Sequence, residues 1–311
     1  TGRPKGAGVI QRGVVNLVQW VQQELHLSAQ DRVLVITSFS FDLTQKNLWA
    51  PLCCGACVVL SPHQEYDPEG ISQSITEQQI SWLNCAPSLF YPLVDKSADL
   101  SALVSLKRLL LGGEAINMPR LRDWLESDSC QAEIINTYGP TECTDIAAFY
   151  RITEALHFAR HPRCPVPLGQ ANAQVKLSIR EASMQRTPIG LPGELCISGW
   201  GVGSGYWQQP ELTAERFVAN PQSQDGFDQI LYRSGDRARY RPDGLLEYLG
   251  RIDQQVKLRG LRVEPGEIEN HVLGYGGVNE AVVLVRDDVL MAWVVRDGIS
   301  DRVTVTALRE R

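Results

Sequence analysis

The 311-residue sequence contains no apolar run that approaches the roughly 18 residues needed to cross a bilayer, and its first residues lack the charged-then-apolar pattern of a signal segment. Positive charge is also scarce, because 30 Lys and Arg face 36 Asp and Glu, for a formal net charge of −6. This balance argues against a general surface for nucleic acid or for an anionic membrane. We therefore expect a globular protein of the cytoplasm with neither kind of partner.

Complete metal-binding cysteine patterns are missing as well. The sequence has 8 cysteines, and Cys54 and Cys57 have the spacing of a metal or redox pair. No second pair of cysteines or histidines completes a zinc site. Most of the cysteines have apolar neighbours, so we expect buried, reduced thiols, as in a cytosolic protein.

Apolar runs alternate with helical patterns through the first half of the chain. Residues 32–37 form a continuous apolar run typical of a buried parallel strand, whereas apolar residues recur every three or four positions within residues 9–25. Such alternation predicts an α/β fold with a doubly wound, largely parallel sheet over residues 1–160.

The pattern changes twice after that sheet. Short alternating segments with Gly and Pro between them predict a small antiparallel sheet or β-barrel over residues 165–249, which completes a large core of residues 1–249. Residues 250–311 then predict a hinge and a partial small C-terminal α/β lobe. The chain starts within a Gly-rich loop and stops in an incipient helix, so we expect a core truncated at its N-terminus, in a piece of a longer polypeptide.

One loop concentrates groups suited to a nucleotide. Residues 136–142 read NTYGPTE and follow a strand-like run. A nucleotide needs a flat face for its base, donors for its phosphates and an anionic ligand for Mg²⁺, and Tyr138, Thr141 and Glu142 could supply these. In open α/β sheets, ligands bind at the carboxyl ends of strands. A tight turn with an incidental charge is the alternative interpretation.

Three further stretches carry candidate groups. Residues 1–6 (TGRPKG) offer backbone N–H groups and Lys5 to a phosphate, or form a simple turn. Asp236 precedes a polar strand and could accept both hydroxyls of a ribose, or be an ordinary hairpin acid. Residues 250–269 are densely charged, but they also hold regularly placed apolar residues, so a structured hinge is favoured over a solvated linker.

Taken in order, these stretches resemble the adenylation domain of nonribosomal peptide synthetases, in the superfamily of adenylate-forming enzymes that includes acyl-CoA synthetases and luciferases. The resemblance spans nearly the whole chain. Its motifs are residues 1–6, 41–42, 136–142, 193–195, 205–206, 210–213, 232–236 and 250–269.

The resemblance implies a role in ATP binding for each matching position. Residues 1–6, with Thr1, Gly2 and Lys5, would bind the pyrophosphate end of ATP. The remaining roles follow the same family pattern: Gly113 and Glu114 flank the adenine, Tyr138 stacks on it, Thr141 contacts the phosphate, Glu142 holds Mg²⁺, Asp236 binds the ribose, Arg251 lies near ribose or phosphate, and Asp253 is the hinge.

The implied reaction has two halves. An amino-acid carboxylate attacks the α-phosphorus of ATP and releases pyrophosphate, and then the phosphopantetheine thiol of a carrier protein attacks the aminoacyl adenylate. The implied partners are a peptidyl carrier domain and a condensation domain in the same or an adjacent chain. The family's final motif supplies an essential lysine for the first half, and it is absent before Arg311. We therefore expect these 311 residues alone to be defective in adenylation.

The same resemblance places the amino-acid substrate. Asp42 would pair with its α-ammonium group, which speaks against an acyl- or aryl-CoA ligase. Its side chain would be surrounded by Leu43, Lys46, Asn84, Leu110, Gly112, Thr137, Asp145 and Ile146. A polar lining predicts a polar side chain, because an aliphatic one leaves buried polar groups unpaired at about 1–3 kcal/mol each.

Two substrate classes stay open. Glutamine or glutamate is favoured because Lys46 and Asn84 could donate to a carbonyl oxygen, and a basic amino acid is favoured if Asp145 pairs with it. If Lys46 and Asp145 pair with each other, neither inference holds. A catalytically inactive module that binds nucleotide or a partner is the remaining alternative, since the lysine motif is missing.

Overall fold

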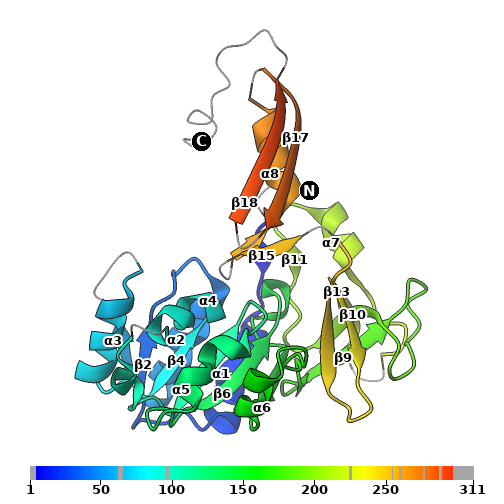
Figure 1. Cartoon of the computed structure of the whole chain (residues 1–311). Coiled ribbons are helices and arrows are strands. Elements are labelled where there is room, and N and C mark those ends of the chain that lie inside the picture. Colours follow the sequence, from blue (N-terminus) through cyan, green and yellow to red (C-terminus); the bar gives the residue numbers. More distant parts are fainter. Residues whose placement is uncertain are drawn as a thin grey trace.

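A seven-stranded sheet with helices on both faces forms the largest part of the molecule (Figure 1). The structure is a computed structural model that describes residues 5–61, 66–95, 98–223, 226–253, 255–258, 261–275, 277–286 and 289–296. The strand order is β3-β2-β4-β5-β6-β7-β8, with parallel pairing from β3 to β6 and antiparallel pairing beyond. The strands are β2 (Arg32–Val35), β3 (Cys57–Leu60), β4 (Trp82–Cys85), β5 (Arg108–Gly112), β6 (Glu133–Tyr138), β7 (Ala148–Arg151) and β8 (Gln170–Ala171).

Successive residues of these strands alternate between two hydrophobic clusters, as the period of two requires. Leu83 and Leu109 pack on one face and Trp82 and Leu110 on the other. The first face is covered by α3 (Pro68–Glu77), α4 (Pro87–Phe90), α5 (Arg122–Leu125) and α6 (Ala155–Arg160), with the short 3-10 turns η1 (Tyr91–Leu93), η2 (Leu100–Leu103) and η3 (Met118–Leu121). The second is covered by α1 (Gln11–Glu24) and α2 (Asp42–Cys54). The predicted doubly wound sheet is thereby confirmed.

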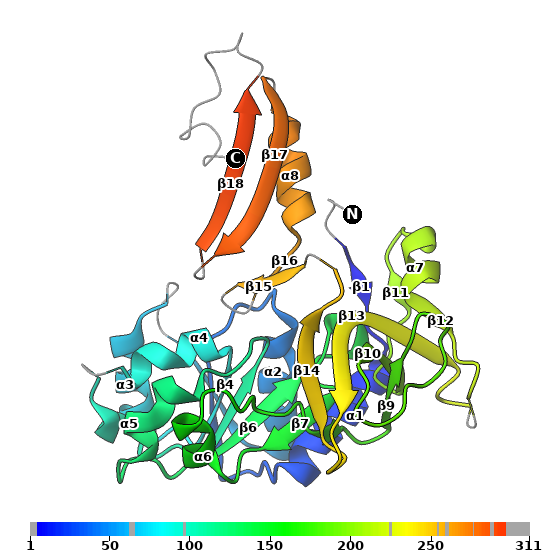
Figure 2. The ribbon, with the colours of Figure 1, turned by 45° about the vertical axis from the view of Figure 1, so that its right-hand side comes forward.

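A smaller antiparallel sheet stands beside the large one (Figure 2). The long strand β13 pairs with β10 on one edge, and with β12 and then β14 on the other. Its two end strands, β9 and β12, are not paired to each other within the described residues, so the predicted β-barrel is an open half-barrel. The elements are β9 (Val175–Arg180), β10 (Gly193–Gly199), α7 (Pro210–Arg216), β12 (Phe217–Ala219), β13 (Ile230–Tyr240) and β14 (Leu246–Arg251).

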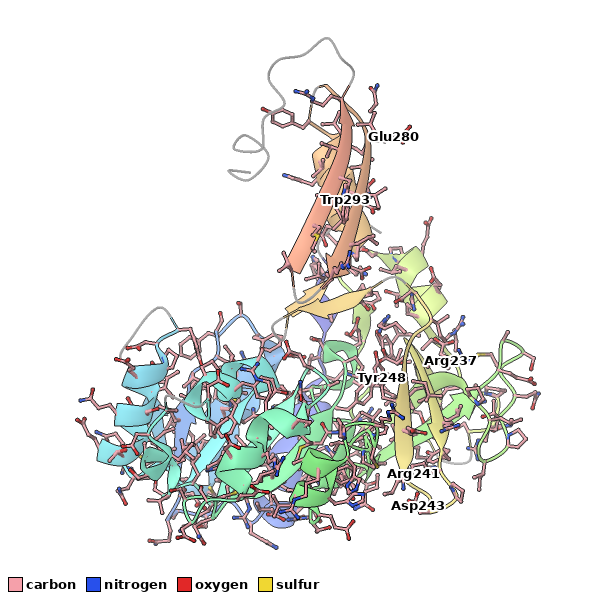
Figure 3. The ribbon with its side chains drawn as sticks, viewed as in Figure 1. Arg237, Arg241, Asp243, Tyr248, Glu280 and Trp293 are labelled. Carbon is pink, nitrogen blue, oxygen red and sulfur yellow. The ribbon has the colours of Figure 1, made fainter. Side chains whose placement is uncertain are left out.

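A small α/β unit stands above the core (Figures 1 and 2). It is reached through a hairpin of β15 (Val256–Leu258) and β16 (Leu261–Val263), where sequence patterns indicated only a loop. Helix α8 (Pro265–Leu273) packs on one face of the antiparallel pair β17 (Val278–Arg286) and β18 (Val289–Arg296). Trp293, labelled in Figure 3, pairs across the strands with Val282, and both are half-exposed on the other face.

Three short elements lie outside the two larger sheets. β1 (Ala7–Gly8) pairs with β11 (Gly205–Tyr206), and the 3-10 turn η4 (Thr141–Cys143) follows β6.

All eight cysteines are free. Cys85, Cys143 and Cys196 are buried as expected, but Cys53 is exposed, because it lies in the last turn of α2 away from the sheet.

Among the helices that the structure describes, none combines the length and the apolar character required to cross a membrane.

Candidate active site

Two adjoining cavities open at the carboxyl ends of β5 and β6. The larger, of about 1070 Å³, is lined by the predicted adenine residues Gly113, Glu114 and Tyr138. The smaller, of about 70 Å³, shares Gly113 and Tyr138 with it. The smaller cavity is also lined by Asp42, Leu43, Gly112, Thr137, Thr141, Asp145, Asp236 and Arg251. Residues predicted for the nucleotide and for the amino acid thus line one continuous region.

The adenine wall is fixed by contacts on both sides. Glu114 accepts hydrogen bonds from the backbone N–H of Ser88 at 3.1 Å and from its hydroxyl at 3.2 Å. Tyr138, the last residue of β6, donates its hydroxyl to Asp236. Burial, and then the charge of Asp236, raise the pKa of Tyr138 well above its usual value, so it remains a donor. The next residue, Gly139, has no room for a side chain, because a Cβ there would lie 1.9 Å from the carbonyl oxygen of Asp145.

Asp236 and Arg251 lie opposite each other on β13 and β14. The Arg251 Nη1 donates to Asp236 Oδ1 at 2.9 Å, and its Nε and Nη2 each donate to Asp253 at 2.6 Å. Burial alone would raise the pKa of Asp253, but the hydrogen bonds and charge of Arg251 outweigh it and lower that pKa. The guanidinium therefore links the predicted ribose acid to the predicted hinge acid.

Asp42 is the first residue of α2, where the helix N-terminus favours negative charge. Its Oδ1 accepts the backbone N–H of Leu43 at 2.7 Å, and its Oδ2 accepts the hydroxyl of Thr141. The group predicted for the ammonium of the substrate is therefore in direct contact with the group predicted for phosphate.

The predicted side-chain pocket is built on the α2-facing side of the sheet. Asn84 pairs with Leu110 and Gly112 with Thr137 on neighbouring strands, so their side-chain positions share this face. Gly112, Thr137 and Asp145, with Leu43, line the smaller cavity. Leu110 and Ile146 are instead buried in the hydrophobic cluster beneath it. Asn84, fully buried, also does not line that cavity.

Lys46 and Asp145 pair with each other. The distance from Lys46 Nζ to Asp145 Oδ2 is 2.6 Å, and Lys46 is buried. Burial, more than the opposing effect of Lys46, raises the pKa of Asp145 to about 6. Because Lys46 and Asp145 pair with each other, neither is available to a substrate. The sequence-based arguments for an acidic or amide substrate and for a basic substrate therefore both fail.

The predicted phosphate and metal groups are engaged by neighbours. Thr1 and Gly2 lie outside the described residues, and Lys5 Nζ lies 2.6 Å from Glu264 Oε1, just before α8. Glu142 is buried and accepts the hydroxyl of Tyr206 at 2.6 Å. In the described part of the chain, no three His, Cys, Asp or Glu side chains form a metal cluster.

A single carboxylate, that of Glu142, is compatible with an Mg²⁺ ion that is bound together with a nucleotide. The ion takes one or two carboxylates and completes its coordination with substrate phosphates and water. Glu142 is adjacent to Thr141, which lines the smaller cavity. The residues present therefore suit a nucleotide-bound Mg²⁺ better than a free one.

Sequence reasoning gave no role to three further residues. Gln255 lines both cavities and donates to Glu264 at 2.9 Å. Tyr248, labelled in Figure 3, lies on β14 and lines the larger cavity. Burial, followed by the charge of Asp236, raises the pKa of Tyr248 to about 12. Tyr206 lay in a matched motif, but the partner of its hydroxyl depends on packing between segments distant in sequence, which no local pattern reveals.

Comparisons with known proteins agree on one family. The profile described as AMP-binding enzyme matches residues 1–207. Tyrocidine synthase 2 of Brevibacillus parabrevis is 37% identical over 93% of this chain and 8% of its own length. The dimodular nonribosomal peptide synthase of Bacillus subtilis (strain 168) is 36% identical over 97% of this chain and 12% of its own length.

Solved structures give the same result. An artificially fused adenylation–PCP di-domain, NpsA-ThdA from Klebsiella oxytoca, aligns with a TM-score of 0.85 and 28% identity over 99% of this chain and 55% of its own. Holo-PA1221 contains adenylation and PCP domains and is bound to a vinylsulfonamide inhibitor. It aligns with a TM-score of 0.83 and 30% identity over 94% of this chain and 49% of its own length. This chain therefore spans about half of these structures and a small part of the curated relatives.

Proposed function

Because this chain belongs to the AMP-binding enzyme family, as an adenylation domain of the nonribosomal peptide synthetase type, we propose that it activates an amino acid with ATP. The products are an aminoacyl adenylate and pyrophosphate. The observation that carries this proposal is the smaller cavity, where Asp42, Thr141 and Asp236 lie together. A carboxylate for the α-ammonium, a hydroxyl for phosphate and a carboxylate for ribose are the groups that the two substrates need.

In the proposed reaction, an oxygen of the substrate carboxylate forms a bond to the α-phosphorus of ATP. The bond from that phosphorus to the bridging oxygen breaks, and pyrophosphate leaves with the electron pair. Such transfers depend mainly on positioning and on charge neutralisation. Asp42 orients the amino acid by its ammonium group, Tyr138 with Gly113 and Glu114 holds the adenine, and Asp236 holds the ribose.

Glu142 is the residue that would hold Mg²⁺, and the ion would neutralise phosphate charge. Thr141 and the loop of residues 1–6 would donate to the phosphates. Arg251 adds a positive charge beside the nucleotide, since it lines both cavities. Asp253, held by Arg251, is the residue about which the small C-terminal unit would turn between the two halves of the reaction.

The substrate side chain that we propose is neutral and donates a hydrogen bond. The pair Lys46–Asp145 balances the charges beside the pocket, so neither an acidic nor a basic side chain finds a free partner. The side-chain amide nitrogen of Asn84 donates to the backbone carbonyl oxygen of Leu43. The side-chain amide nitrogen of Asn47 donates to the backbone carbonyl oxygen of Asn84. Carbonyl oxygens only accept, which fixes both amide orientations.

In this orientation of the Asn84 amide, its side-chain oxygen is available as an acceptor. Asn84 Oδ1 is buried and has no hydrogen-bond partner within the described part of the chain. A buried acceptor left unpaired costs about 1–3 kcal/mol. Asn84 does not line the smaller cavity, but it shares the face of the sheet that carries Gly112, so we propose that a substrate side chain extending past Gly112 donates a hydroxyl or amide N–H to it. Glutamine, from the sequence-based prediction, remains within this class; glutamate and basic amino acids do not.

The second half of the reaction transfers the aminoacyl group to a carrier. The sulfur of a phosphopantetheine arm forms a bond to the acyl carbon, AMP leaves, and the thiol proton is released. Relatives that contain adenylation and PCP domains support a peptidyl carrier domain as partner. A condensation domain in the same or an adjacent chain is the further partner that we propose.

Pyrophosphate exchange in the full-length adenylation domain, over a panel of all proteinogenic amino acids, tests the proposal. We expect exchange that requires Mg²⁺ and is strongest for a neutral hydrogen-bond donor such as glutamine, asparagine, serine or threonine. Best exchange with leucine or phenylalanine would overturn the substrate class alone. Exchange with fatty or aromatic acids but with no amino acid, and transfer to coenzyme A in place of a carrier, would overturn amino-acid activation itself.

A further inference from the structure

We propose that Tyr206 is a positioning residue that holds the Glu142 carboxylate for the nucleotide-bound metal ion. The inference rests on the proposed function, in which Glu142 is the Mg²⁺ ligand. The Tyr206 hydroxyl donates to Glu142 Oε1 at 2.6 Å, and both side chains are buried. A hydrogen bond from a hydroxyl to a carboxylate is among the stronger kinds in proteins, so it fixes the side-chain rotamer of Glu142.

The segment that carries Tyr206 also fixes the two neighbouring parts of the phosphate site. The backbone N–H of Gly203 donates to the carbonyl oxygen of Glu142 at 2.8 Å, and that of Ser204 donates to Gly8 at 2.8 Å. Tyr206 itself pairs with Ala7 between β11 and β1, directly after the predicted phosphate loop. One short segment therefore sets the position of the metal ligand relative to Ala7 and Gly8, which follow that loop in the sequence.

Three neighbours hold Tyr206 in place, one through its backbone and two through its phenol group. Its backbone N–H donates to the Thr213 hydroxyl at 2.9 Å, and Phe217 packs against the ring edge with centroids 5.6 Å apart. Tyr232 places its own hydroxyl 3.5 Å from that of Tyr206. A rigid donor of this kind is how proteins orient metal ligands, and loss of such a partner typically costs about 10–100-fold in metal affinity or activity.

The test is metal binding by the full-length adenylation domain, measured with Mn²⁺ by electron paramagnetic resonance in the presence of ATP. Tyr206→Phe removes one hydroxyl and keeps the ring. We expect its Mn²⁺ affinity in the ATP complex to fall by about 10–100-fold. Binding of ATP without metal should stay the same, which a merely structural role would not produce. Tyr232→Phe is the matched control, because it removes the neighbouring hydroxyl and leaves the Glu142 bond intact.

The Glu142→Gln variant distinguishes the metal-binding role of Glu142 from the positioning role of Tyr206. Unchanged Mn²⁺ affinity in Glu142→Gln overturns the metal role of Glu142, and with it the premise of the inference. Weakened affinity in Glu142→Gln together with unchanged affinity in Tyr206→Phe overturns the positioning role alone. Equal losses in Tyr206→Phe and Tyr232→Phe, or a parallel loss of metal-free ATP binding, also overturn it.

Thr213→Val carries the test if Tyr206→Phe does not fold. It removes the hydroxyl that accepts the Tyr206 backbone N–H and leaves the phenol in place. We expect an intermediate loss of Mn²⁺ affinity with unchanged metal-free ATP binding. No loss in a folded Thr213→Val protein would contradict the positioning role.

Discussion

Lys46 on α2 and Asp145 in the loop after β6 form an ion pair of 2.6 Å at the inner end of the predicted amino-acid pocket. Their side chains are 2% and 11% exposed, so the pair is largely shielded from water. Breaking a buried pair leaves an uncompensated charge, which is far more costly than removing both partners together. The pair therefore sets the net charge that a substrate side chain meets, and this charge can be altered in either direction.

Single and double substitutions of this pair should shift selectivity in opposite directions. Asp145→Asn leaves Lys46 unpaired, so we expect glutamate and aspartate to gain at least about tenfold in relative pyrophosphate exchange, in line with unpaired-charge costs of a few kcal/mol. Lys46→Met leaves Asp145 unpaired and should favour lysine or ornithine. The double variant restores neutrality and is the control, with selectivity near that of the wild type. An identical substrate ranking in all four proteins contradicts the role of the pair.

The same pair predicts a dependence of selectivity on pH. The pKa of Asp145 is raised to about 6, first by burial, so its carboxyl group is protonated at pH 5 and ionised at pH 8. Below pH 6, Lys46 loses its counter-charge as it does in Asp145→Asn. We expect the ratio of glutamate to glutamine exchange to rise as the pH falls from 8 to 5 in the wild type. In Asp145→Asn this ratio should be flat over the same interval, apart from ionisation of glutamate itself.

Folding stability provides a second measurement of that titration. The folded-state pKa lies above the ordinary value of 3.8, so the contribution of this carboxyl group is fully present below about pH 3.8 and is lost as the pH rises through about 6. The wild type should therefore lose stability relative to Asp145→Asn between pH 4 and pH 7, as measured by urea unfolding. A constant difference between the two proteins across that interval contradicts the raised pKa.

Sequence patterns predicted the fold because hydrophobic periodicity acts locally. The alternation that places Leu109 and Leu110 in different clusters can be counted along the chain, and so can the change to short alternating strands after the first sheet. The hairpin of β15 and β16 was not predicted, because its two three-residue strands are too short for a period to be recognised.

Site residues were predicted from motifs, but their partners were not. The contacts Thr141–Asp42 and Lys46–Asp145 each join residues 99 positions apart, and Tyr138–Asp236 joins residues 98 apart. Such pairs form only when α2, the loop after β6 and β13 are brought together by the packing of two sheets. For this reason the sequence alone showed that the substrate predictions depend on whether Lys46 and Asp145 pair with each other, but it did not show that the pair forms.

Asp236 should determine how well the enzyme distinguishes ribose from deoxyribose. In Asp236→Asn, one acceptor oxygen and the negative charge are lost, so we expect the KM for ATP to rise by about 10–100-fold, as for loss of a charged hydrogen bond of about 1.5–3 kcal/mol. Discrimination between ATP and 2′-deoxy-ATP should fall at the same time. Asp243→Asn is the matched control (Figure 3), because Asp243 lies in the turn between β13 and β14 and pairs with Arg241 at 2.8 Å. Equal effects of the two substitutions would make Asp236 an ordinary hairpin acid.

Gly112 should set the size of the amino-acid side chain. A Cβ at this position would lie 2.4 Å from Thr137 Oγ1, and 3.1 Å from the Thr137 carbonyl oxygen, at a point that lines the smaller cavity. Gly112→Ala therefore displaces Thr137 and fills part of a cavity of only about 70 Å³. Overpacking of this kind costs about 1–3 kcal/mol. We expect exchange with glutamine to fall by at least about tenfold, while serine is affected less.

The double variant Gly112→Ala/Thr137→Ala identifies the cause. It removes the hydroxyl that the new methyl group would meet and leaves the backbone contact, so exchange with glutamine should recover in part. Thr137→Ala alone is its reference, because it removes the hydroxyl that donates to Leu111 at 3.3 Å and adds no bulk. If the double variant is no better than Gly112→Ala, the loss comes from the backbone at Thr137. If Gly112→Ala retains the wild-type ranking of glutamine and serine, this wall of the cavity does not contact the substrate side chain.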